Sequence, residues 1–158
     1  MTEPRAHARV EAEAERTPRL SLFLGYGAMA PLVLAALTVW ALEGPGRGLL
    51  LQLALLWGAA LLLFLSGVRR GLSFRTPGGP RKAELAAVFG LFALGLAVMI
   101  APLPLGAALM TLGFLTLAVI DPLAARRGEA PRFFPNLRPP QMALAALASG
   151  ALWLNIGA

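Results

Sequence analysis

Apolar residues in this chain gather in five long runs, and polar residues collect in the segments between them. The run from Leu49 to Val68 reads LLLQLALLWGAALLLFLSGV, with Gln52 as its one strongly polar side chain. A transmembrane helix needs roughly 20 mostly apolar residues, so this run predicts a membrane-spanning helix. Arg69 and Arg70 follow at once, and basic residues at such a position resist translocation.

The other four runs are similar in composition, and the shorter ones reach about 25 Å as helices, just enough to cross a bilayer. Residues 43–48 predict a tight turn, residues 102–104 leave almost no loop inside a helical hairpin, and Asp121-Pro122 predicts the end of the fourth span. A polar, disordered cytoplasmic tail at residues 1–19 precedes a transmembrane domain at residues 20–158. The predicted fold is all-α, a polytopic integral membrane bundle of five transmembrane helices at about residues 20–42, 49–68, 85–101, 105–120 and 141–157.

The basic residues predict the orientation of this bundle. Of the 14 Lys and Arg residues, 13 fall in the tail and in residues 69–84 and 121–140, and Arg47 alone falls in the alternate segments. Cytoplasmic loops carry the excess of basic residues in membrane proteins. We therefore expect the N-terminus in the cytoplasm and the C-terminus outside.

Composition excludes several functional classes. The chain is 58% hydrophobic with a net charge of +6, but its basic residues lie in short segments between apolar runs, which argues against nucleic acid as a partner. It has no cysteine for disulfides, iron–sulfur clusters or cysteine-bound zinc, and its one histidine, His7, lies in the polar tail. No ionisable side chain falls near the middle of a span, where functional charges are expected. We therefore expect no enzyme activity, no catalytic or metal site and no cofactor.

Two charged residues at the predicted cytoplasmic ends of different spans form a candidate interhelical pair. Arg69 ends the second span and Asp121 ends the fourth. A pair between them would hold these two helices together. Alternatively, Arg69 contacts lipid phosphate and Asp121 caps the loop that follows it.

The segment PRFFP at residues 131–135 mixes aromatic rings with a cation, which suits a position at the level of the lipid headgroups. Together with the arginines at the same end of the bundle, it supplies the candidate contacts for a lipid headgroup or a partner protein. These candidate residues are Arg69, Arg70, Phe133, Phe134 and Arg138.

Three segments resemble motifs of the uncharacterised bacterial and mitochondrial membrane family typified by transmembrane protein 69. They are LGYG at residues 24–27 with Ala30-Pro31, FLSGVRRG at residues 64–71, and DPLAARRGEAPRFFPNLR at residues 121–138. The sequence departs from the family pattern at four points: Ser66 replaces a glycine, Arg70 an aromatic residue, Pro122 a basic residue, and Phe133-Phe134 a Trp-Tyr pair. The resemblance extends from Leu20 to the C-terminus and implies a five-helix inner-membrane protein of no established activity.

These observations predict a non-catalytic accessory or assembly subunit of a larger inner-membrane complex, such as a respiratory or photosynthetic one. The alternative is a small lipid- or quinone-binding or transport protein that grips a headgroup. Arginine outnumbers lysine 13 to 1 amid many Ala, Gly and Pro residues, which indicates a GC-rich bacterial genome. The expected location is the bacterial inner (cytoplasmic) membrane, with membrane lipids as the surrounding partners.

Overall fold

The computed structural model describes residues 19–74, 76, 78–128 and 134–157. The predicted tail, apart from Arg19, and the candidate contact Phe133 lie outside these residues. The described part is all-helical and contains no strand. Its elements are α2 (Arg19–Thr38), the 3₁₀ turn η1 (Val39–Ala41), α3 (Gly44–Ser73), α4 (Lys82–Ile100), α5 (Leu103–Arg126) and α6 (Phe134–Gly157).

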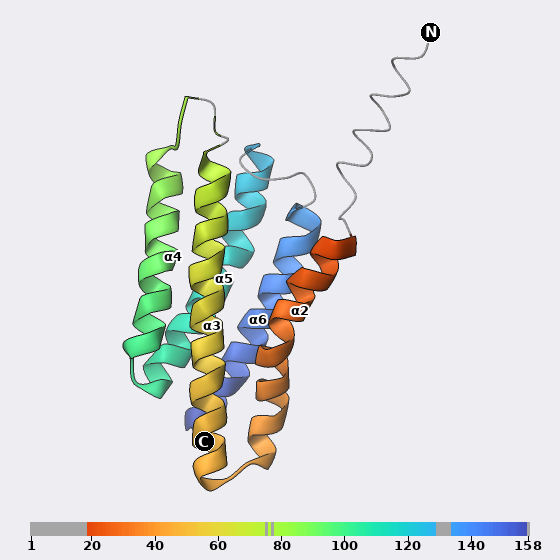
Figure 1. Ribbon diagram of the computed structural model, residues 1–158, viewed down its shortest axis with the longest axis vertical. Coiled ribbons are helices and arrows are strands. Elements are labelled where there is room, and N and C mark those ends of the chain that lie inside the picture. Colours follow the sequence, from red (N-terminus) through yellow and green to blue (C-terminus); the bar gives the residue numbers. More distant parts are fainter. Residues whose placement is uncertain (1–18, 75, 77, 129–133, 158) are drawn as a thin grey trace.

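The five α-helices run up and down side by side in one bundle (Figure 1). The first turns of α2, α4 and α6 meet the last turns of α3 and α5 at one end, which we call the basic end. The η1 turn, the α4–α5 connection and the last turn of α6 lie toward the opposite end. Helix α4 is at one edge and packs against α3 and α5, whereas α2 packs more closely on α6 than on α3.

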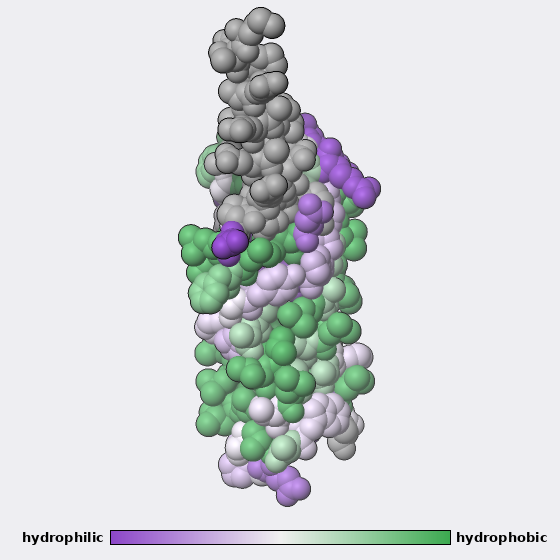
Figure 2. All heavy atoms as spheres, turned by 90° about the vertical axis from the view of Figure 1, so that its right-hand side faces the viewer, coloured by the Kyte–Doolittle hydropathy of each residue, from purple (hydrophilic) through white to green (hydrophobic). Residues whose placement is uncertain are grey.

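Four of the helices, α2 with η1, α3, α4 and α5, are long and apolar enough to cross a membrane. Figure 2 shows a broad hydrophobic band over the side of the bundle that carries α2, with polar residues at its two ends. Large apolar side chains on the outer surface, such as Phe23, Phe64 and Phe89, are more than 60% exposed. Such a surface is typical of helices that face lipid, and the four apolar helices indicate a multi-pass membrane protein.

Helices α3, α5 and α6 extend beyond the predicted spans by five residues or more. Helix α3 begins at Gly44, so most of the predicted turn at residues 43–48 is helical. Pro45 occupies the first turn, where a backbone N–H would have no partner within the helix. The fixed φ of proline also suits a helix. Helix α5 continues through Asp121-Pro122 to Arg126, and α6 starts at Phe134 rather than near Gln141. Proline removes one helical hydrogen bond without ending a helix whose neighbours hold it in place.

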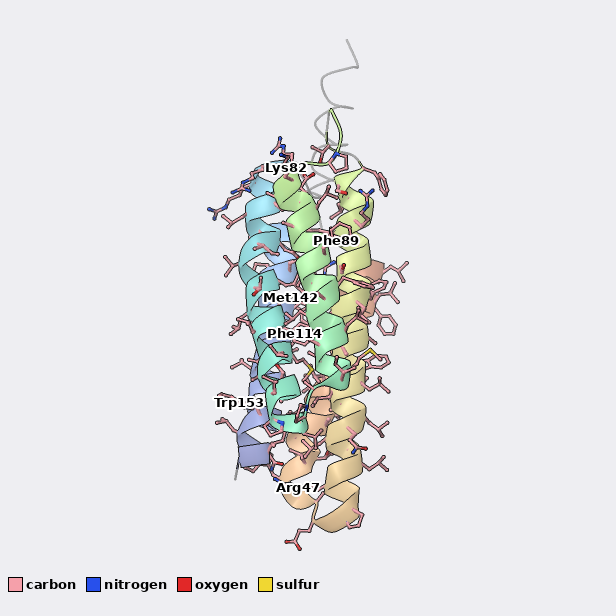
Figure 3. The ribbon with its side chains drawn as sticks, turned by 90° about the vertical axis from the view of Figure 1, so that its left-hand side faces the viewer. Arg47, Lys82, Phe89, Phe114, Met142 and Trp153 are labelled. Carbon is pink, nitrogen blue, oxygen red and sulfur yellow. The ribbon has the colours of Figure 1, made fainter. Side chains whose placement is uncertain are left out.

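The core lies between α3, α5 and α6, where Leu62, Met110, Phe114 and Met142 are fully buried. Figure 3 shows Phe114 and Met142 inside the bundle and Phe89 on its outer side. Polar links join neighbouring helices: the Ser66 hydroxyl donates to the carbonyl of Val88 (2.8 Å), and Thr111 donates to Ser149 (3.0 Å).

Helix α2 contains Pro31 and bends along its length, and its N-terminal half leans away from α3 while it follows α6 (Figure 1). The indole N–H of Trp57 on α3 donates to the carbonyl of Ala28 (2.9 Å), three residues before this proline. Side chains of adjacent helices commonly satisfy carbonyls near a proline in a membrane helix. A cavity lies beside the part of α2 that precedes Pro31, toward the basic end.

Candidate functional site

A buried carboxylate joins three helices at the basic end of the bundle. Asp121 of α5 is 4% exposed. One of its oxygens accepts a hydrogen bond from the guanidinium of Arg69 on α3. Its other oxygen lies 3.7 Å from Nε of Arg138 on α6. The structure therefore places the two residues of the predicted Arg69–Asp121 pair together and adds a second arginine from a third helix.

This ion triad carries an excess of positive charge. It sets one carboxylate against two guanidinium groups, and Nε of Arg69 and Nε of Arg138 are buried without a hydrogen-bond partner in the described structure. An unpaired polar atom in a buried position has a free-energy cost comparable to that of a lost hydrogen bond. The triad can therefore attract a further anion or a hydrogen-bond acceptor.

The remaining predicted contact residues are distributed around the triad. Arg70 turns to the end of its own helix, where it donates to the hydroxyl of Ser73 (2.8 Å) and lies 3.9 Å from the ring centre of Phe74. Phe134 is buried, with the guanidinium of Arg138 located 4.8 Å from its ring centre. Four of the five predicted contacts are therefore described, all at the basic end, and Arg69 and Arg138 share one carboxylate.

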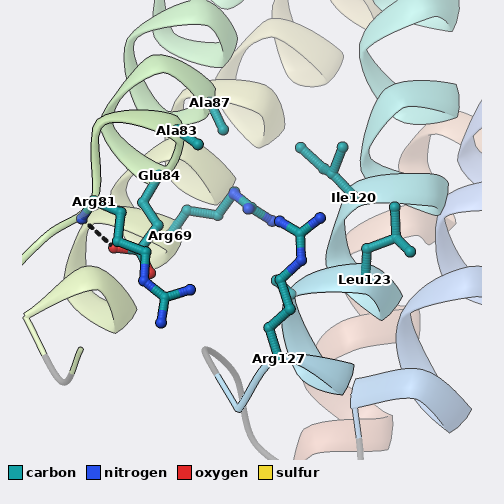
Figure 4. Close-up of a pocket in the computed structure, with 9 residues that line it drawn as sticks. Arg69, Arg81, Ala83, Glu84, Ala87, Ile120, Leu123 and Arg127 are labelled. Carbon is teal, nitrogen blue, oxygen red and sulfur yellow. Dashed lines mark hydrogen bonds between the residues drawn. The ribbon is translucent and has the colours of Figure 1, made fainter. Parts of the chain in front are cut away.

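A cavity of about 240 Å³ opens beside Arg69 between α3, α4 and α5. We call it the arginine pocket, because Arg69, Arg81 and Arg127 line it together with one acidic residue, Glu84. Figure 4 shows the side chains of Arg69 and Arg127 extending toward one another from α3 and α5, with Arg81 entering from the start of α4. The Glu84 carboxylate already accepts hydrogen bonds from the Arg81 backbone N–H and the Thr76 hydroxyl, each 2.8 Å long. The pocket thus has the charge of an anion site.

A second, largely apolar cavity of about 430 Å³ lies between α2, α3 and α6, and we call it the α2–α3–α6 groove. Two polar residues of α6, Arg138 and Gln141, line it. The amide N–H of Gln141 donates to the carbonyl of Gly25 (2.7 Å), while the amide oxygen of Gln141 is buried without a partner. The groove therefore combines apolar walls with a free acceptor and lies next to the ion triad.

Sequence reasoning missed Arg138 as a partner of Asp121 and did not single out Gln141. One signal was present: Gln141 is a strongly polar residue at the first position of a predicted span. Sequence reasoning also missed a polar contact at the opposite end, where Nε of Arg47 donates to the Asn155 side chain (3.0 Å) and joins α3 to α6. Arg47 and Asn155 are separated by 108 residues, so only the folded arrangement brings them together.

Within the described ranges, no three His, Cys, Asp or Glu side chains come together as metal ligands.

Comparison with known proteins identifies a family but no individual relative. No curated protein and no solved structure matches the chain. The sequence profile of one family, described as protein of unknown function (DUF3429), matches residues 17–155. This match covers nearly the whole chain, which therefore belongs to the DUF3429 family, as its resemblance to an uncharacterised membrane family predicted.

Proposed function

We propose that this protein crosses a bacterial inner membrane five times, with its N-terminus in the cytoplasm and its C-terminus outside. Support for the fifth crossing comes from α6, whose 24 residues give a length of about 36 Å and which runs along α2 and α5 inside the bundle. Its polar residues Arg138 and Gln141 face neighbouring helices and are therefore not exposed to lipid. Support for the orientation comes from the bias of basic residues.

The natural absence of cysteine makes this topology directly testable. We expect a membrane-impermeant maleimide to label Glu43→Cys in intact cells and to label Lys82→Cys only after the membrane is opened. Both positions are exposed and lie at opposite ends of the bundle. Labelling of both residues, or of Lys82→Cys alone, in intact cells would contradict the proposed orientation.

The function that we propose is that of a non-catalytic accessory or assembly subunit of a larger inner-membrane complex. The observation that carries this proposal is the outer face of α4. Ala86, Gly90 and Ala93 follow one another at helical spacing along this face, and all three are exposed. An added Cβ at Gly90 would meet no atom within 4 Å.

Small residues at such spacing allow two membrane helices to approach closely, as in small-xxx-small contacts. The exposed side chains of Phe89 and Leu96 stand beside this row of small residues and add large side chains for packing. Helix α4 is also an edge helix, whose main packing partners in the described bundle are α3 and α5. A transmembrane helix of another subunit fits this face.

Native electrophoresis of mildly solubilised membranes, with mass spectrometry of the band, tests the subunit proposal. We expect the wild type to migrate with a stoichiometric complex and Gly90→Leu to migrate alone, because a leucine fills the row of small residues. Gly27→Leu on α2 is the matched control, because Gly27 is equally open and should leave the complex intact. Migration of the wild type as a monomer or small homo-oligomer, or retention of Gly90→Leu in the complex, would contradict the proposal.

The arginine pocket favours a second candidate function, the binding of an anionic lipid headgroup. Its three arginines outnumber its one acid, and it lies at the end of the bundle that we place at the cytoplasmic leaflet, where anionic lipids attract basic residues. The same native preparation separates the two functions. Anionic lipid that copurifies with the wild type and with Arg126→Gln, but not with Arg127→Gln, would support this candidate, because Arg126 does not line the pocket.

A further inference from the structure

The α2–α3–α6 groove contains a polar pair whose hydrogen-bonding capacity is incomplete. Gln141 lines the groove and is 3% exposed, and its amide oxygen has no hydrogen-bond partner. The orientation of the amide is fixed, because its N–H₂ donates to the carbonyl of Gly25 and a flipped amide would set two oxygens against each other. One residue of the groove wall therefore holds a buried hydrogen-bond acceptor that has no partner.

The second member of the pair is Arg138, which is 9% exposed and whose Nε has no hydrogen-bond partner. One oxygen of Asp121 lies 3.7 Å from this Nε, which is too far for a hydrogen bond. Arg138 and Gln141 thus lie one helical turn apart on α6 and line the same cavity. One holds a buried donor and the other a buried acceptor, and neither atom has a partner. A group that satisfies both has to donate and accept, which is the capacity of a hydroxyl.

The rest of the groove is suited to an apolar body. Its walls include Leu24 and Met29 of α2 and Leu61 and Leu65 of α3. The exposed ring of Phe64 also lines it, at the surface that faces lipid. Along α3, Val68 lies nearest the basic end and Leu61 lies about 10 Å deeper in the bundle. An amphiphile in the groove would place its head beside Gln141 and its tail toward the bilayer interior.

We propose that the α2–α3–α6 groove binds a neutral amphiphile with a hydroxyl head, which donates to the amide oxygen of Gln141 and accepts from Arg138. The volume of about 430 Å³ is within the range of small-molecule sites. Diacylglycerol and quinol share this chemistry, since each carries a free hydroxyl on an apolar body. The proposal does not depend on the subunit role or on the arginine pocket, because neither involves Gln141.

Thermal unfolding of the detergent-purified full-length protein, titrated with defined probes, tests the proposal. We expect dioctanoylglycerol or decylubiquinol to raise the unfolding midpoint, because a ligand that binds the folded state stabilises it. Trioctanoylglycerol and decylubiquinone lack the donating hydroxyl and should bind about fivefold more weakly, the effect of one lost hydrogen bond. A response to only one of the two hydroxyl probes would support the proposal and identify the head as glyceride or quinol.

Two pairs of variants locate the site. Gln141→Met should weaken binding of the responding hydroxyl probe about fivefold, whereas Gln52→Met, at an exposed glutamine outside the groove, should not. Phe64→Ala should also weaken binding, whereas Phe89→Ala should not. These two phenylalanines are 66% and 65% exposed, so neither change disturbs the core and both variants remain folded.

Three results would overturn the proposal. The first is that neither of the two hydroxyl probes shifts the unfolding midpoint. The second is equal affinity for a hydroxyl probe and its acceptor-only counterpart, which would remove the role of the Gln141 oxygen. The third is an equal loss of affinity in Phe64→Ala and Phe89→Ala, which would indicate general partition onto the apolar surface.

Discussion

Replacing Asp121 by alanine should lower the free energy of unfolding by about 3–5 kcal/mol, the usual effect of removing one partner of a buried ion pair. The reason is that the change leaves two arginines, on α3 and α6, without their shared anion. The side chains of Arg69 and Arg138 are only 13% and 11% exposed, so both charges stay largely buried after the carboxylate is removed. Unfolding in mixed micelles with increasing SDS, followed by circular dichroism, measures the loss.

A double-mutant cycle separates the pair energy from general damage to the fold. Asp121→Asn and Arg69→Gln should each destabilise the protein, and the double variant should lose clearly less than the sum, because residues in one ion pair are coupled. Arg126→Gln is the control on the same helix, since Arg126 is exposed and should change the free energy by no more than about 0.5 kcal/mol. Full additivity of the two single changes would refute the Arg69–Asp121 interaction.

The helices and their order could be predicted because lipid-facing helices need long apolar runs, and such runs are visible in one dimension. The run from Leu49 to Val68 lies wholly inside α3. Helix ends were less predictable. Asp121-Pro122 looked like the end of a span, yet α5 continues for four residues beyond Pro122. In the folded bundle Arg69 and Arg138 neutralise Asp121, so a charged residue does not have to mark the end of the helix.

The candidate site was only partly predictable, for a related reason. The sequence predicts the Arg69–Asp121 pair because it places both residues at the same membrane face. That prediction requires only that successive spans alternate in direction. The contact of Gln141 with Gly25 requires that α2 and α6 be neighbours in the bundle. The order of the helices along the chain does not predict that packing. The α2–α3–α6 groove further depends on the direction in which α2 bends, which the sequence does not give.

Replacing Gly95 by leucine should destabilise the bundle by about 3 kcal/mol, the upper part of the range for overpacking a well-packed core. Gly95 is a buried residue of α4 at the contact with α3. A Cβ at this position would lie 2.9 Å from Cγ of Leu63 and 3.3 Å from the backbone oxygen of Ala59. The side chain of Leu63 can shift, but the carbonyl of Ala59 is part of the α3 backbone, so α3 and α4 have to separate. Micellar unfolding with SDS measures this effect too.

Gly90→Leu is the matched control, because it makes the same substitution in the same helix at a position where an added Cβ meets nothing within 4 Å. The gain in helix propensity from glycine to leucine is therefore similar at both sites and cancels in the comparison. We expect Gly90→Leu to be at least as stable as the wild type while it loses the proposed partner. If Gly95→Leu is as stable as the wild type, α3 and α4 do not approach closely at Gly95. Equal destabilisation would mean that the Gly90 face is packed inside the protein, and the subunit proposal would then lose the open face on which it rests.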